Sequence, residues 1–260
     1  MTRNGGFILN IALLSKPEII ILNKRSFKYN LADAEKDYLL AVVSKILFES
    51  PLKNKLVFKG GSAIHHCYLD QTRLSEDLDF TSLDSAITLD EVKSVLSKYD
   101  FLQVLDDYMS EATIKIGRLK YNGPLGQPNS LKVEIDFKQN VVLPAKAMPY
   151  RNVWKVKVSA PVMDIREICA EKIRAASGRA RYRDFYDLSL LFEHYEFDIK
   201  EIKSLIFQKE IRGPITSQLM LRNWDIAKKE KESEISRVYY AQDISDTQIK
   251  KLIQRIGINI

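Results

Sequence analysis

The sequence predicts an α+β protein in which a mixed α/β half precedes a helical half. Residues 113–119 and 131–137 alternate between apolar and polar side chains, which is typical of half-buried strands. Residues 32–49 instead carry apolar side chains at helical spacing. Beyond residue 160 the alternation stops, and the long segments have a helical period. We therefore expect two domains, residues 1–160 and residues 161–260.

The individual elements follow from these two periodicities and from the turn residues between them. Pro51 ends the first long helix, and a loop rich in Gly and Pro at residues 123–128 separates the two alternating strands. The expected helices are 32–49, 63–69, 89–99, 164–177, 184–195 and 199–208, with further helices after them. The expected strands are 56–58, 78–80, 113–119, 131–137 and 153–158, and residues 7–14 form either a helix or a strand.

The composition fits a folded protein with a polyanionic partner. Hydrophobic residues make up 45% of the 260-residue chain, which is enough for a sizeable core. The formal net charge of +6 suits a nucleotide or an RNA. Two cysteines cannot form a disulfide framework, which favours a cytoplasmic location. The apolar run at residues 7–14 is shorter than the roughly 20 residues of a membrane span, so no membrane contact is expected.

Paired carboxylates point to a metal site. Asp77 and Asp79 are two apart in a predicted strand, so both lie on the face opposite Leu78. Neighbouring carboxylates repel each other unless a cation lies between them, and Mg²⁺ prefers such oxygen ligands. Asp136, on a second strand, would complete a three-carboxylate site if the two strands are neighbours. The alternative is a solvated polar strand face without a metal.

A glycine pair shortly before these carboxylates favours the metal interpretation. Gly60 and Gly61 can adopt backbone angles that let a ligand approach the main chain. Ser62 follows at the expected start of a helix, where free N–H groups attract anions. The turn would hold a triphosphate, and the carboxylates would hold the metal ion bound to that triphosphate. By contrast, the adjacent His65 and His66 have no third partner nearby, so no zinc site is expected.

Five motifs in this order resemble the AbiEii/AbiGii-type nucleotidyltransferase toxins, which belong to the polymerase-β-like nucleotidyltransferase superfamily. Residues 58–63 read FKGGSA, and residues 73–80 read RLSEDLDF. Further along the chain are VEIDF at 133–137, EICAEKIRA at 167–175 and RDFYDL at 183–188. The resemblance implies a polymerase-β-like mixed-sheet domain, followed by a helical domain that contributes a Lys and an Asp to the site.

The resemblance also implies roles for particular residues. It assigns catalysis to Asp77, Asp79, Asp136, Lys172 and Asp184, with the first three as ligands of Mg²⁺ or Mn²⁺. Contacts to the nucleotide fall to Lys59, Gly60, Gly61, Ser62, Ser75 and Lys172.

Two of these residues have alternative explanations. Lys172 lies on the apolar stripe of its helix, so its side chain either extends along the helix to solvent or faces a site. With the resemblance, it becomes a triphosphate contact or a stabiliser of the leaving group. Asp184 could be a helix N-cap. The resemblance instead makes it an essential acid that positions Lys172 or the acceptor, and Asp187 is the second candidate for this role. The basic residues at 179, 181 and 183 could contact RNA phosphates or form a solvated loop.

The function expected from these features is metal-dependent nucleotidyl transfer by a toxin of a toxin–antitoxin or abortive-infection system. The enzyme would move a nucleoside monophosphate from an NTP to an acceptor and release pyrophosphate. The resemblance offers tRNA as the acceptor and an antitoxin protein as a partner. The alternatives are a nucleotidyltransferase acting on a small molecule or a protein side chain, or a catalytically inactive relative that serves as a binding module.

Overall fold

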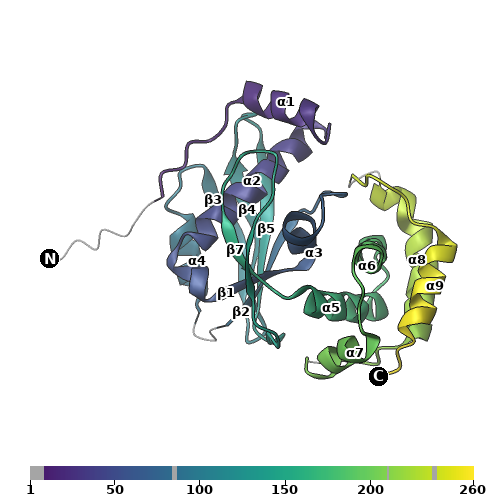
Figure 1. The fold of residues 1–260 in the computed structure, drawn as a ribbon. Helices are drawn as coiled ribbons and strands as arrows, with labels where there is room; N and C mark the ends of the chain where they lie inside the picture. The colour runs from purple at the N-terminus through teal and green to yellow at the C-terminus, as the bar shows by residue number, and fades with distance from the viewer. Residues whose placement is uncertain (1–8, 84–86, 210, 236–238) are drawn as a thin grey trace. The chain divides into compact units, whose positions relative to one another are not determined.

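The structure is a computed structural model that describes residues 9–83, 87–209, 211–235 and 239–260, without the side chains of residues 230 and 232–235 (Figure 1). The chain forms two compact units. The first unit consists of Met1–Phe58, Glu76–Phe137 and Ala147–Pro161. The second unit consists of Lys59–Ser75, Lys138–Lys146 and Val162–Ile260. Two short earlier segments thus belong with the C-terminal helices, and the domains 1–160 and 161–260 stay a prediction.

A mixed seven-stranded sheet forms the centre of the first unit. Its order is β3 (Leu102–Met109), β4 (Thr113–Asn122), β5 (Pro128–Asp136), β2 (Asp77–Ser82), β1 (Leu56–Lys59), β7 (Ser159–Val162) and β6 (Lys146–Pro149). Strand β4 runs antiparallel to both β3 and β5, whereas β2 and β5 are parallel. The parallel pair brings together two strands that are separated by α4, β3 and β4 in the chain, and both carry predicted site residues.

The helices of the first unit are α1 (Lys16–Arg25), α2 (Leu31–Phe48) and α4 (Leu89–Leu96), with a short 3₁₀ turn at Pro51–Asn54. The side chain of Asn30 caps α2 by accepting a hydrogen bond from the Asp33 amide. Phe48 of α2 packs on Phe80 of β2, with ring centroids 5.6 Å apart. This contact fixes which face of β2 is covered, and the alternate residues of β2 therefore lie on the other face.

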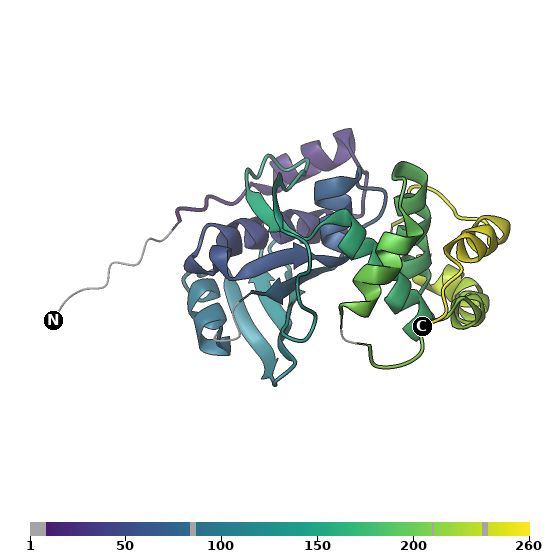
Figure 2. The same cartoon turned by 60° about the horizontal axis from the view of Figure 1, so that its bottom comes forward.

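The second unit is helical (Figure 2). It contains α3 (Gly60–Ala63), a π-helical turn at Ile64–Tyr68, α5 (Ile165–Gly178), α6 (Tyr182–His194), α7 (Ile199–Phe207), α8 (Ser217–Ile235) and α9 (Asp246–Ile256). Helix α5 packs against α6, α7 and α8. Trp224 of α8 lies against Tyr182 and Phe185 of α6, with ring centroids 5.9 and 5.3 Å apart. Among the helices in the described ranges, none combines the length and apolar composition of a membrane span.

The predicted strand at residues 153–158 is wrong. The side chain of Asn152 organises these residues into a turn instead: its Oδ1 accepts hydrogen bonds from the amides of Trp154 and Val156. Its Nδ2 donates to the carbonyls of Tyr150 and Val156. Asn is a strong turn former because it can hydrogen-bond its neighbouring backbone in this way. Local side-chain chemistry therefore overrides the apolar–polar alternation here, and the strand β7 starts later.

Two other expected elements have different positions. Residues 9–14 form neither helix nor strand, and residues 7 and 8 lie outside the described residues. Pro17 lies in the first turn of α1, where a proline costs no hydrogen bond. The helix expected at 63–69 begins earlier, at Gly60, and continues as the π-helical turn from Ile64.

Candidate functional site

The carboxylates of Asp77 and Asp79 share one face of β2. Both residues are half-buried, whereas Leu78 and Phe80 between and after them are fully buried. This alternation confirms the predicted orientation of the strand: its apolar side chains face the core, and its carboxylates face away from it. The pair therefore has the placement that a metal site on this strand requires.

Asp136 lies on the same face of the neighbouring strand, but not directly opposite Asp79. In the parallel register, Asp79 is paired with Glu134, and Asp136 is paired with Thr81. Glu134 in turn forms an ion pair with Lys115, with 3.1 Å between Nζ and Oε2. Within the described ranges, no three His, Cys, Asp or Glu side chains gather closely enough to hold a metal ion. A three-carboxylate site that includes Asp136 thus stays a prediction.

The chemistry of the remaining pair fits a magnesium ion. Mg²⁺ usually binds through one or two carboxylates and completes its coordination with waters and substrate phosphates. Asp77 and Asp79 supply two such carboxylates on one strand face. A third protein ligand is therefore not needed for the pair to hold the ion when a triphosphate is present.

Gly60 and Gly61 are required for different reasons in the Gly60-Gly61-Ser62 segment. Gly60 has a φ of 73° at the junction between β1 and α3, in the left-handed region that favours glycine. At Gly61, a Cβ atom would lie only 2.3 Å from Nη2 of Arg73. Ser62 donates a hydrogen bond from Oγ to Oγ of Ser75, at 2.8 Å. The close approach to Gly61 thus comes from a side chain of the same protein.

Lys59 does not point freely to solvent. Its Nζ lies 3.4 Å from Oε2 of Glu171, and the two side chains are largely buried. Lys209 also contacts Glu171, with 2.9 Å between Nζ and Oε1. Burial alone would raise the pKa of Glu171, but the charges of Lys59 and Lys209 lower it to about 2. A nucleotide phosphate that binds Lys59 would therefore compete with a permanently charged carboxylate.

Lys172 is buried on α5, and the alternative in which it extends to solvent is wrong. Only 8% of the residue is exposed. Its Nζ lies 3.1 Å from Oδ1 of Asp184 and 2.7 Å from Oδ2 of Asp187. Both carboxylates are on α6, three residues apart, and residues at this spacing share one face of a helix. The pairing satisfies the general rule that a lysine inside a protein has a charged partner.

Asp184 is not the N-cap of its helix. The capping position belongs to Arg181, and Asp184 lies in the first turn of α6. Its carboxylate accepts hydrogen bonds from Arg179, at 2.7 Å from Nε and 3.2 Å from Nη2. Burial would raise the pKa of Asp184, but Lys172 and Arg179 lower it to about 2. Because the side chain is fully buried, its contact with Lys172 favours a role in positioning that lysine.

Asp187 has more charged and polar partners than Asp184. The guanidinium of Arg73 donates two parallel hydrogen bonds to it, each 2.7 Å long, from Nε to Oδ1 and from Nη2 to Oδ2. Nε2 of His65 lies 3.0 Å from Oδ1. Burial would raise the pKa of Asp187, but the charges of Arg73 and Lys172 hold it well below its usual range. Burial lowers the pKa of His65 to about 4, so at neutral pH the ring is uncharged and donates Nε2–H to Asp187.

These side chains form one group, which we call the Asp187 cluster. It consists of His65, Arg73, Lys172, Arg179, Asp184 and Asp187. Sequence reasoning assigned no role to Arg73 or His65. The available signal was the position of Arg73 inside the RLSEDLDF motif, but its partner is 114 residues away in the chain.

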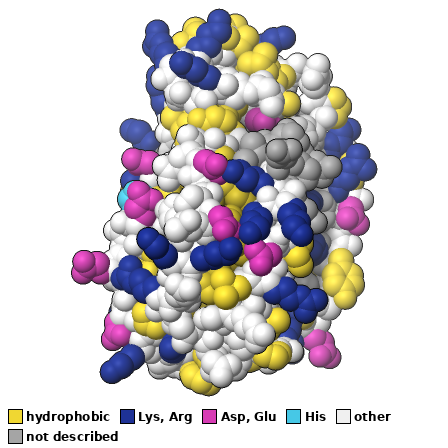
Figure 3. Space-filling view, turned by 90° about the vertical axis from the view of Figure 1, so that its right-hand side faces the viewer, with side chains coloured by type: hydrophobic (Ala, Val, Ile, Leu, Met, Phe, Trp, Pro, Cys, Tyr) yellow, Lys and Arg dark blue, Asp and Glu magenta, His cyan; other side chains and the backbone are white. Residues whose placement is uncertain are grey.

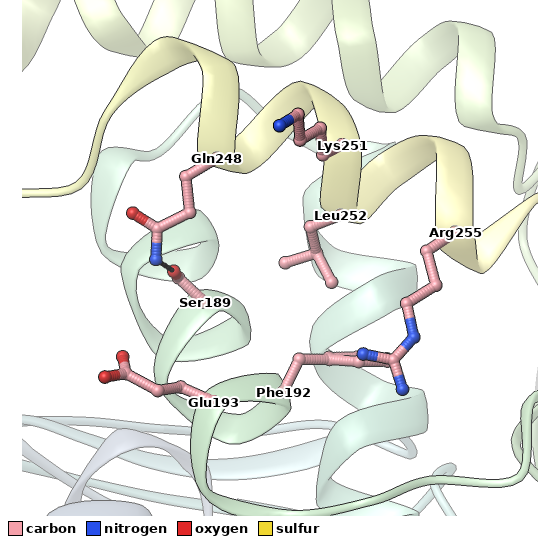
Figure 4. A pocket seen from close by; sticks show the side chains of 7 residues that line it. All are labelled: Ser189, Phe192, Glu193, Gln248, Lys251, Leu252 and Arg255. Carbon is pink, nitrogen blue, oxygen red and sulfur yellow. Dashed lines mark hydrogen bonds between the residues drawn. The ribbon is translucent and has the colours of Figure 1, made fainter.

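A hollow elsewhere in the second unit contains none of the predicted site residues. It has a volume of about 330 Å³ and lies between α6 and α9 (Figure 4). The guanidinium of Arg255 lies 5.5 Å from the ring centroid of Phe192, and Gln248 donates a hydrogen bond to Ser189 at 2.8 Å. These contacts hold the two helices together along the hollow.

Comparison with known proteins settles the family. Residues 43–252 match the family described as "Nucleotidyl transferase AbiEii toxin, Type IV TA system". The chain belongs to the AbiEii nucleotidyltransferase toxin family. It is therefore a nucleotidyltransferase toxin of a type IV toxin–antitoxin system, which agrees with the resemblance to this toxin family. Membership implies an NTP as substrate, usually a divalent metal ion, and an antitoxin as partner.

One solved structure supports the fold. The chain is similar to MenT4, a nucleotidyltransferase toxin from Mycobacterium tuberculosis, with a TM-score of 0.66 and 18% identity over 92% of this chain and 87% of that one. This likeness confirms the predicted α+β fold with a mixed sheet. An antigenic nucleotidyltransferase-like protein from Paracoccidioides brasiliensis matches with a TM-score of 0.39 and 18% identity, covering 78% of this chain and 90% of that one. The comparison with curated proteins gives no match.

Proposed function

We propose that this AbiEii-family enzyme transfers a nucleoside monophosphate from an NTP to an acceptor hydroxyl. The acceptor oxygen forms a bond to the α-phosphorus while the bond from that phosphorus to the bridging oxygen of the β-phosphate breaks. Pyrophosphate leaves with the electron pair of the broken bond, and the hydroxyl proton passes to solvent. The observation that carries this proposal is the pair of half-buried carboxylates, Asp77 and Asp79, on one face of β2.

Asp77 and Asp79 would hold a divalent cation, Mg²⁺ or Mn²⁺, and Asp136 is the proposed third ligand. Such an ion, when bound, neutralises charge on the phosphates and orients the attacking and leaving oxygens. The role of the protein is to hold both carboxylates in place on a rigid strand. The sheet supports this role because β2 has a neighbouring strand on each side.

Lys172 is proposed to stabilise the negative charge that develops on the triphosphate. A lysine ammonium group has three N–H donors, and Asp184 and Asp187 accept two of them. The third remains available for a phosphate oxygen. Preorganised cations of this kind stabilise transition states without further reorganisation. Gly60, Gly61, Ser62, Ser75 and Lys59 remain proposed nucleotide contacts.

RNA, and tRNA in particular, is the proposed acceptor. Its support is the net charge of +6 and the resemblance to the toxin family. The basic residues at 179, 181 and 183 suggested an RNA contact, but the Arg179 guanidinium already donates a hydrogen bond to Asp184 and is therefore less available to RNA. On the face over α8 and α9, Asp and Glu side chains are interspersed among the Lys and Arg side chains, so this face is not uniformly basic (Figure 3). A small molecule or a protein side chain is the alternative acceptor, and the experiment includes both.

The test is a screen of the purified protein with each of the four NTPs labelled at the α-phosphate. Every NTP is incubated with Mg²⁺ and either total RNA, a protein extract or a metabolite extract. We expect label to enter RNA with one or two of the NTPs. Label in the protein or metabolite fraction instead would select the alternative acceptor, and no transfer under any condition would refute the proposed activity.

A further inference from the structure

We propose that Arg73 is a positioning residue, which packs directly against Gly61 of the Gly60-Gly61-Ser62 segment and fixes Lys172 through Asp187. This inference rests on the proposed function, because Lys172 and the glycine segment are its proposed nucleotide contacts. Arg73 itself is almost completely buried, and its side-chain hydrogen bonds go to Asp187 and to the Leu74 carbonyl. Its effect on the reaction would therefore pass through other residues.

The guanidinium of Arg73 is fixed by three hydrogen bonds. Nε and Nη2 each lie 2.7 Å from a different oxygen of Asp187, and Nη1 donates to the Leu74 carbonyl at 3.0 Å. A planar guanidinium paired with both carboxylate oxygens has a defined orientation as well as a defined position. A lysine in its place could not make both contacts.

The backbone that carries Arg73 is also held. Ala241 N donates to the Thr72 carbonyl at 2.6 Å, and Leu74 N donates to the Tyr239 carbonyl at 3.1 Å. Arg73 itself pairs with Tyr240 in an isolated antiparallel β-bridge between these two segments. The guanidinium consequently has little freedom to move with its own backbone.

Gly61 lies against this fixed group. A Cβ atom at Gly61 would be 2.3 Å from Nη2 of Arg73 and 3.3 Å from Oγ of Ser75. A clash with the end of an arginine is usually relieved by a small movement of that side chain. Here the movement would break the paired hydrogen bonds to Asp187. The absence of a side chain at Gly61 is therefore explained by the position of Arg73, independently of any ligand.

Asp187 connects this contact to Lys172. Its Oδ2 accepts from Nη2 of Arg73 and lies 2.7 Å from Nζ of Lys172. Movement of the guanidinium would therefore change the position of the ammonium group as well. The Asp187 cluster contains three cationic side chains, two carboxylates and the neutral His65, and so has one net positive charge, which suits an anionic ligand.

The contact is tested by a double-mutant cycle on thermal unfolding. Gly61→Ala is compared in the wild-type and Arg73→Lys backgrounds, because lysine keeps the charge and removes the atom that clashes. We expect Gly61→Ala to lower the Tm by about 3–10 °C in the wild type, the range for overpacking in a chain of this size. In the Arg73→Lys background, it should lower the Tm by less than half as much. Gly178→Ala, where a Cβ meets no atom within 4 Å, is the matched control.

Equal Tm losses in both backgrounds would overturn the contact. The positioning role is tested separately, by NTP turnover of Arg73→Lys at a temperature where it is fully folded. We expect kcat to fall about 10- to 100-fold, since a displacement of about 1 Å costs up to a hundredfold. Wild-type kcat in the folded variant would overturn the positioning role. Absence of transfer by the wild type would refute the proposed function and with it the positioning role, while the thermal cycle would still decide the contact.

Discussion

Replacing Lys172 with methionine separates the catalytic role of this residue from its structural role. Met retains most of the length of the side chain and removes only the ammonium group. That group lies 3.1 Å from Asp184 and 2.7 Å from Asp187. Both carboxylates lose one cation, but Asp184 keeps Arg179, and Asp187 keeps Arg73 and the His65 N–H. Neither is left as an isolated buried charge.

The expected cost in stability is therefore moderate, while the cost in activity is large. Removing one partner of a buried ion pair costs about 3–5 kcal/mol when the other charge is left uncompensated. With the remaining partners of both carboxylates, we expect roughly 1–3 kcal/mol for Lys172→Met, or a Tm that is lower by about 2–10 °C. Loss of a preorganised electrostatic group costs about 2–4 kcal/mol of transition-state stabilisation, which lowers kcat about 30- to 900-fold.

The assay combines thermal unfolding with NTP turnover. Turnover is measured about 15 °C below the Tm of the variant, a margin larger than the expected shift in Tm. Lys209→Met is the matched control, because Lys209 is equally buried and also contacts two carboxylates, Glu167 and Glu171. We expect Lys209→Met to lose stability without a comparable loss of kcat. A folded Lys172→Met variant with wild-type turnover would refute the catalytic role of Lys172.

Three further predictions concern the carboxylates and the histidine. Asp77→Ala should abolish transfer and leave the Tm nearly unchanged. The control Asp100→Ala, at an exposed position, should leave both transfer and the Tm unchanged. An active Asp77→Ala variant would contradict the metal site. Removing divalent cations with EDTA should stop transfer, and added Mg²⁺ should restore it; full activity in EDTA would exclude a role for a metal. Because the pKa of His65 is about 4 when folded and 6.5 when exposed, the unfolded state binds the extra proton. Stability should fall by about 3 kcal/mol as the pH drops from 6.5 to 4, and His65→Gln should remove that part of the pH dependence; an unchanged pH profile would argue against it.

The sequence predicted those features that depend on local periodicity. The alternation around Asp77 and Asp79 gave their common face, because a strand fixes the direction of every second side chain. The apolar stripe of α5 included Lys172 but left open whether its side chain extends to solvent, and only the contacts with Asp184 and Asp187 decide this. The face of Asp136 followed in the same way, although its register against β2 did not. Register depends on how the strands align in the sheet, which is a property of the fold rather than of the segment.

The features that were missed depend on contacts between distant residues or on single side chains. Arg73 and Asp187 are 114 residues apart, and no periodicity links them. The reason for a glycine at position 61 becomes visible only when the guanidinium of Arg73 is in place. The turn at Asn152 arises from four hydrogen bonds of one side chain, which outweigh the alternation that follows it. In each case, specific hydrogen bonding decided the structure where the general pattern was ambiguous.

The central claim is nucleotidyl transfer, and the most direct test follows the two ends of the triphosphate separately. The enzyme is incubated with its acceptor, Mg²⁺ and the same NTP labelled either at the α-phosphate or at the γ-phosphate. Attack at the α-phosphorus predicts that the α label enters the acceptor and the γ label appears in pyrophosphate. The Asp77→Ala variant should leave the acceptor unlabelled. Transfer of the γ label to the acceptor would instead show phosphoryl transfer by a kinase-like reaction, and would contradict the account.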